Sequence, residues 1–295
     1  MSQSVEKSLD LLSNIKKRPE NYLFHYTRTE TALDAILISN TIRFSPLTGT
    51  NDLEETRRFG DIHLIHDGTT QTESMSILME AKAVLPLRYR SASFCSNRMP
   101  CVDEPFMHDR YGFAFPRMWA TYGANHKGVC LVFYLPELRK AFTEFTDKNH
   151  LIEGSVRYMS DNELVWQAAL NKPLAIPNPV TDLEHIHNHI VKRSDYFFFR
   201  KQFDWRDECE YRFIYYGQEN AGASVDINFG SSLVGMAVGN RNSYDEKCEI
   251  SAVANFHSLP CFVIESTGIG SFPRPLDTET LGRPQTSAFH PPTNT

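Results

Sequence analysis

Apolar and polar positions follow two different periods along the chain. Near the N-terminus, apolar side chains recur every three or four residues and predict a helix over residues 3–17. Further on, short apolar or alternating runs predict strands. These lie at 22–26, 41–45, 91–96, 129–135, 154–159, 210–216, 223–229, 233–239 and 261–267. Capping boxes at 27–30, 160–163 and 243–246 each predict the start of a helix. Further helices are predicted over residues 71–84, 118–122 and 181–202.

Short strands and helices without regular alternation predict an α+β fold. We expect residues 1–19 to form an N-terminal helix and residues 20–267 to form a single domain. Residues 268–295 contain five prolines and few apolar anchors, so a flexible or loosely docked tail is predicted there.

Composition narrows the class of protein. The 295 residues are 41% hydrophobic and carry a net charge of -6, which gives no global basic field for nucleic acid or an anionic membrane. No apolar run is long enough to span a bilayer, and the N-terminus lacks the apolar core of a signal peptide. The six cysteines form no Cys-x-x-Cys pair, which favours reduced thiols over a zinc site or disulfides. We therefore expect a cytoplasmic protein without a membrane partner.

Two carboxylates stand at the start of the strand predicted at 210–216. Glu208 and Glu210 have i, i+2 spacing, which on a strand places both side chains on one face. Neighbouring like charges contribute little to folding, whereas a cleft that stabilises a cation or orients a nucleophile would use both. The alternative is a solvated strand edge with Arg212 as the counter-charge.

Aromatic and histidine residues supply further candidates. At the end of the first strand, His25 would donate to a ligand hydroxyl and Tyr26 would stack on a ring. The alternative is a core tyrosine beside a histidine satisfied by backbone. Trp119 and Tyr122 lie i, i+3 on one helix face, which lines either a cleft or the core.

Two other segments invite a metal interpretation. Asn51, Asp52 and Glu54 follow a turn and would bind a metal or a polar ligand, although a helix cap is the commoner explanation. His185 and His189 share a helix face without an evident third ligand, so a solvated face is favoured and no metal is predicted there.

The order of the motifs resembles a bacterial family, the one catalogued as domain of unknown function 2971. The resemblance covers roughly residues 20–267. It is carried by Phe24-His25-Tyr26-Thr27, Ile42-Arg43-Phe44-Ser45, Asn51-Asp52-x-Glu54, Phe94-Cys95-Ser96, Met118-Trp119-Ala120-x-Tyr122-x-x-x-His126-x-Gly128 and Lys201-x-x-x-Trp205-x-x-Glu208-x-Glu210-Tyr211-Arg212.

More distantly, the layout looks like the ADP-ribosyltransferase superfamily. That likeness implies a split, mixed β-sheet around a cleft that binds NAD as a substrate. It matches His25 to the first motif of the superfamily, Ser96 to the second and Glu208-Cys209-Glu210 to the third. The second motif lacks the full Ser-Thr-Ser, so Tyr26 or Tyr122 is the alternative ring for stacking on nicotinamide.

The likeness also implies roles for the candidate residues. Glu210 would bond the ribose 2′-hydroxyl and stabilise the oxocarbenium-like sugar, and Glu208 would orient or deprotonate the nucleophile. Arg43 would pair with the pyrophosphate. His25 would fix the adenosine-side ribose within a binding surface completed by Tyr26, Thr27, Ser96, Trp119 and Tyr122. The acceptor would be a protein or nucleic acid. Members of this superfamily are often toxins or anti-phage defence effectors, some with a neutralising or regulatory partner.

Three alternatives stay open from the sequence. Water as the nucleophile would make the protein an NAD glycohydrolase. A metal-dependent nuclease or phosphodiesterase would use Asp52, Glu54, Glu208 and Glu210 as oxygen ligands. A non-catalytic protein would bind partners through its aromatic surface and proline-rich tail.

Overall fold

The structure is a computed structural model that describes residues 3–49, 54–65, 72–98, 110–146, 150–160, 162–163, 175–177, 180–217, 222–267 and 270–276. Its helices are α1 (Gln3–Lys17), α2 (Thr29–Thr31), α3 (Leu37–Ser39), α4 (Glu54–Gly60), α5 (Thr72–Arg88), α6 (Pro116–Thr121), α7 (Leu135–Thr146), α9 (Leu183–Val191), α10 (Ser194–Phe198) and α11 (Tyr244–Phe256). The strands are β1 (Tyr22–Thr27), β2 (Thr41–Pro46), β3 (His63–Leu64), β4 (Tyr89–Cys95), β5 (Val129–Tyr134), β6 (Leu151–Ser155), β7 (Arg157–Met159), β8 (Ala175–Ile176), β9 (Arg200–Gln202), β10 (Glu210–Tyr216), β11 (Val225–Asn228), β12 (Leu233–Val238), β13 (Cys261–Thr267) and β14 (Gly270–Pro275).

A mostly antiparallel sheet organises the fold, in the order β11-β2-β4-β1-β5-β12-β13-β14, with β10 paired to β4 and β6 paired to β10. The pair β12 and β13 is parallel, so the sheet is mixed and the α+β prediction is confirmed. Two short parallel pairs lie apart from it, β3 with β8 and β7 with β9. No helix in the described part of the chain is long and apolar enough to cross a membrane.

The side chains of β1 illustrate how the sheet separates two cores. Leu23 joins the cluster beneath α7 and α11, whereas Tyr22, Phe24 and Tyr26 join the cluster beneath α1 and α6. This two-residue alternation is what a strand buried on both faces requires. The β1 strand is therefore anchored on both sides, which fixes the backbone that carries His25.

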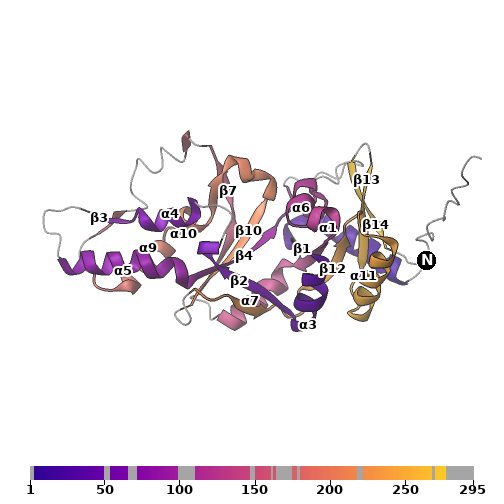
Figure 1. The fold of residues 1–295 in the computed structure, drawn as a ribbon, viewed down its shortest axis with the longest axis horizontal. Coiled ribbons are helices and arrows are strands. Elements are labelled where there is room, and N and C mark those ends of the chain that lie inside the picture. The colour runs from indigo at the N-terminus through magenta and orange to yellow at the C-terminus, as the bar shows by residue number, and fades with distance from the viewer. Residues whose placement is uncertain are drawn as a thin grey trace, which may run out of the picture.

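A third cluster fills the end of the molecule formed by α4, α5, α9 and α10 (Figure 1). Phe59, Tyr89, Phe197, Phe198 and Tyr216 pack against one another there. At the opposite end, α1 and α11 lie beside β13 and β14 (Figure 1). The strands β4 and β10 run between these ends. Their side chains pack into the third cluster and into the cluster beneath α7 and α11, which hold both strands in place.

Several sequence predictions need correction. The helix predicted over 181–202 is divided into α9, α10 and β9, because the aromatic run at 196–199 is buried in the third cluster. The capping box predicted at Thr27 is not formed: Arg28 is the N-cap, and Thr29 Oγ1 donates to Lys127 O. By contrast, the Ser243 capping box is present, and Asn40 ends its helix in the left-handed conformation.

The C-terminal region also differs from the sequence prediction. Residues 270–275 form β14, which pairs with β13 over six residue pairs, and Leu276 is buried. Proline at alternate positions of an edge strand leaves the neighbour's hydrogen bonds intact. The expected tail therefore does not begin at residue 268. Residues 277–295 lie outside the described part of the chain.

Candidate functional site

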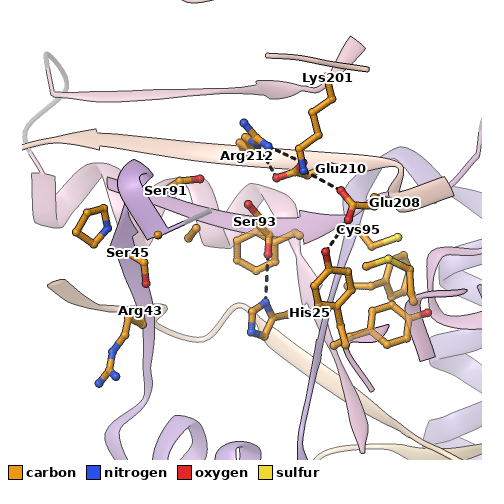
Figure 2. A pocket seen from close by; sticks show the side chains of 18 residues that line it. His25, Arg43, Ser45, Ser91, Ser93, Cys95, Lys201, Glu208, Glu210 and Arg212 are labelled. Atoms are coloured by element: carbon orange, nitrogen blue, oxygen red, sulfur yellow. Dashed lines mark hydrogen bonds and ion pairs between the residues drawn. The ribbon is translucent and has the colours of Figure 1, made fainter. Parts of the chain in front are cut away.

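A cavity of about 290 Å³ opens where β1 and β2 separate along the same edge of β4. The β2 strand pairs with β4 at Ser45↔Ser91 and Pro46↔Arg90, and β1 pairs with it at Phe24↔Cys95. Between those contacts, the Ser93 carbonyl accepts from His25 Nδ1 at 3.2 Å. Figure 2 shows this hydrogen bond on the opposite side of β4 from the Glu210 carboxylate.

Strand β10 brings charged groups to the other edge of β4. Glu210 lies opposite Cys95, and Arg212 lies opposite Ser93. Directly opposed residues on antiparallel strands project to the same face. The register therefore places Glu210 and Arg212 on the face that Cys95 and Phe24 share, whereas the alternation of β1 directs His25 toward Phe94 on the other face. The cavity lies at the gap between β1 and β2, and all three charged or polar side chains line it.

Four buried charges form a continuous network at this face. Lys201 Nζ lies 2.8 Å from Glu208 Oε2 and 2.8 Å from Glu210 Oε2. Arg212 donates Nε and Nη2 to the two oxygens of Glu210, and Nη1 to the Phe198 carbonyl. All four residues are at most 7% exposed. Among the described residues of this network, two anions and two cations balance, which is the condition under which buried charges are tolerated.

The backbone that positions Glu208 differs from the sequence prediction. It ends the 3₁₀ segment Phe203–Glu208, and Cys209 follows in the left-handed conformation (φ 44°, ψ 47°). Only Glu210 belongs to the strand, so the expectation that one strand face carries both carboxylates is wrong. They converge because Cys209 redirects the chain and Lys201 lies between them. The backbone N–H and hydroxyl of Ser96 both donate to the Cys209 carbonyl at 2.8 Å and hold this turn.

The network sets the ionisation of Glu210. Burial alone would raise the pKa of this carboxyl, but Arg212 and Lys201 outweigh burial and lower it to about 2. Tyr158 accepts from the Glu210 N–H at 2.8 Å, and burial raises the pKa of its phenol. Glu210 is therefore a fixed anion at neutral pH. Burial also lowers the pKa of His25, which favours a neutral imidazole.

The cavity includes some of the candidate residues. Tyr122 lines it and donates its hydroxyl to Glu208 Oε1 at 2.6 Å. Arg43 stands at its exposed side in an ion pair with Asp226. Figure 2 shows the Arg43 guanidinium directed away from the carboxylates.

Other candidates lie in the core or outside the cavity lining. Tyr26 contributes to the lining, but its ring packs edge-on against Trp119 and its hydroxyl donates to the Gly112 carbonyl. Trp119 is 1% exposed and donates Nε1 to Phe113 O, so it belongs to the core. Thr27 and Ser96 do not line the cavity. Ser96 instead bonds the Cys209 carbonyl and so holds the turn between Glu208 and Glu210.

The metal interpretations find no support among the described residues. No group of three histidine, cysteine, aspartate or glutamate side chains there is arranged to hold a metal ion. The expected solvated face is wrong for His189, which is buried, and its Nδ1 accepts from Arg193 Nη1 at 3.3 Å. His187, between the two predicted histidines, is hydrogen-bonded through Nδ1 to the Tyr89 hydroxyl at 2.7 Å, and burial lowers its pKa to about 4. The predicted acidic turn, with Asn51, Asp52 and the Glu54 side chain, lies outside the described residues.

Lys201 is the main site residue whose role was not predicted. The sequence indicated this role only weakly, since a single lysine seven residues before Glu208 is as compatible with a solvent-exposed position as with a buried ion pair. Lys201 Nζ also lies 5.3 Å from the centroid of the Trp205 ring, so these two residues of the motif make a cation–π contact. Ser45, Ser91 and Ser93 also line the cavity and were not singled out.

Comparison with known families supports the family resemblance over part of the chain. The family model described as "Protein of unknown function (DUF2971)" matches residues 118–213. That stretch contains Tyr122, Lys201, Glu208, Glu210 and Arg212, so it covers the charged side of the cavity but not β1 or β2. No curated protein and no solved structure matches the chain.

Proposed function

We propose that the cavity binds NAD and that the protein transfers ADP-ribose to a macromolecular acceptor. The observation that carries this proposal is that His25 and Glu210, from strands on opposite edges of β4, line one cavity. An anion fixed beside a sugar stabilises the positive charge that develops when the bond to nicotinamide breaks. Because nicotinamide leaves as a neutral molecule, the reaction needs no strong general acid.

Glu210 retains acceptor capacity for this role. A carboxylate offers about four acceptor positions. Three are taken by N–H groups of described residues, namely Arg212 Nε, Arg212 Nη2 and Lys201 Nζ. No donor among the described side chains takes the fourth, which we assign to the ribose 2′-hydroxyl, while Arg212 and Lys201 hold the carboxylate in position.

The size of the cavity suggests how NAD would lie. At about 290 Å³, it is at the lower end of the range for small-molecule pockets. It therefore suits the nicotinamide-ribose half, and the pyrophosphate would extend toward exposed Arg43. In this arrangement His25 contacts the nicotinamide-ribose half and not the adenosine-side ribose that the sequence likeness implies. Binding there requires the pyrophosphate to compete with Asp226 for the guanidinium.

The test follows nicotinamide release and transfer of label from NAD to macromolecules in a cell lysate. We expect Glu210→Gln to lower the rate of nicotinamide release by about 100-fold or more, since it removes the charge that stabilises the transition state. Glu265→Gln removes a remote, half-exposed carboxylate paired with Arg274 and serves as the control. Both variants are compared at equal folded fraction.

Each outcome has a distinct meaning. Full activity of Glu210→Gln would overturn the assignment of Glu210. Nicotinamide release without labelled macromolecules would favour the glycohydrolase. A wild-type protein that neither binds nor consumes NAD would refute the proposed function.

A further inference from the structure

We infer that Lys201 is a positioning residue that joins Glu208 and Glu210 into one charge-balanced unit and holds both carboxylates in place at the cavity. The catalytic part of this inference rests on the proposed function; the electrostatic part does not. Lys201 lies on β9, where it is the register partner of Tyr158 on β7. Its Nζ reaches both glutamates at 2.8 Å.

The two glutamates depend on Lys201 to different degrees. Glu210 also holds both N–H arms of the Arg212 guanidinium. Glu208 accepts from the Tyr122 hydroxyl at its other oxygen, and this partner is neutral. Glu208 therefore relies on Lys201 as its close cation, whereas Glu210 has a second one.

The groups that face this unit come from several elements. Tyr158 approaches from β7, Tyr122 from the end of α6, and Cys209 lies between the glutamates with Arg98 Nε 3.4 Å from its sulfur. Cys95 lies opposite Glu210 on β4. Among these facing groups Arg98 is the further cation, and its own ion pair is with Asp207.

Removing the Lys201 charge leaves two anions and one cation among the described members of this buried unit. Like charges that share a site cannot both stay ionised, so one carboxyl takes up a proton. Arg212 stays with Glu210, and the proton therefore goes to Glu208. A protonated Glu208 can neither accept a proton from an incoming nucleophile nor orient it as an anion.

Lys201→Met, whose new side chain has a similar length and no charge, should have a pH-dependent defect in nicotinamide release. At pH 7 we expect nicotinamide release to fall by about 100-fold, the usual scale for loss of a general base. The rate should recover as the pH rises and Glu208 ionises. Lys201→Arg keeps the charge and should retain most of the activity. Lys247→Met is the control, because Lys247 bonds only a remote backbone carbonyl among the described contacts.

Titration of the free protein tests the inference without NAD. Side-chain carboxyl NMR should show a glutamate pKa raised toward neutrality in Lys201→Met and absent from Lys201→Arg. If both glutamates remain ionised in Lys201→Met down to acidic pH, the inference is overturned. If wild type releases no nicotinamide, the proposed function fails while the titration still decides the role of Lys201.

A double variant covers the case in which Lys201→Met does not fold. Glu208→Gln combined with Lys201→Met restores one anion and one cation, so it should fold and have a higher melting temperature than Lys201→Met. A double variant less stable than the single one would contradict charge balance by Lys201.

Discussion

Arg212→Met is expected to lower the free energy of unfolding by about 3–5 kcal/mol, the range for removing one partner of a buried ion pair. Arg212 is 2% exposed and binds both oxygens of Glu210 and the Phe198 carbonyl. Methionine fills much of the same space but leaves the carbonyl unbonded and the network one positive charge short. Urea denaturation at pH 7 measures the loss.

The matched control is Arg274→Met. Arg274 pairs with Glu265, but both side chains are about half exposed. Exposed pairs contribute about 0–1 kcal/mol, so this variant should unfold almost as the wild type does. Equal effects of the two substitutions would show that the Arg212 network contributes no more than a surface pair.

The same network predicts how stability depends on pH. Glu210 has a pKa of about 2 in the folded protein against an ordinary value of 4.5. Because the folded value is lowered, its contribution is complete above about pH 4.5 and is lost as the pH falls through 2. The difference corresponds to about 3 kcal/mol. Arg212→Met raises the pKa of Glu210, so the stability gap between variant and wild type should narrow as urea midpoints are followed from about pH 6 to about pH 2. A gap that stays constant would contradict this assignment.

Strands were more predictable than the geometry of the site. The boundaries of β10 and β13 match the sequence prediction because their apolar runs are bounded by a charged segment or by proline and glycine. In contrast, β14 was missed because alternating prolines resemble a disordered tail, and its pairing with β13 depends on a neighbour that composition does not reveal. The α7 helix was missed where it follows β5 without a connecting loop.

The candidate site was predictable in its residues and not in their connections. Glu208 and Glu210 were selected for their spacing on a strand, yet they meet through a left-handed Cys209 and a lysine from another strand. Spacing reports only local periodicity, whereas Lys201 reaches the carboxylates through the pairing of β9 with β7. Long-range contacts of this kind leave no periodic signal in the sequence.

Trp119 provides the second large expected effect, because its predicted place in a ligand-binding surface differs from its observed place in the core. Trp119→Ala should lower the free energy of unfolding by about 3–5 kcal/mol, as for other buried aromatic side chains replaced by alanine. The substitution opens a cavity beside Tyr26 and leaves the Phe113 carbonyl without its donor. Thermal and urea unfolding measure the loss.

Trp119→Phe separates the two roles of this position. Phenylalanine keeps most of the ring against Tyr26 but loses the hydrogen bond to Phe113, so stability should fall by about 1–3 kcal/mol, the cost of an unsatisfied buried carbonyl together with a smaller ring. A core residue should leave the affinity for NAD within about twofold, whereas a stacking residue contributes about 0.5–1.5 kcal/mol and its loss weakens binding by up to about tenfold. Unchanged stability combined with weakened NAD binding would contradict the core role and show that Trp119 contacts NAD. The expected result, lower stability with unchanged binding, places Trp119 behind β1 as the support that holds His25 at the cavity.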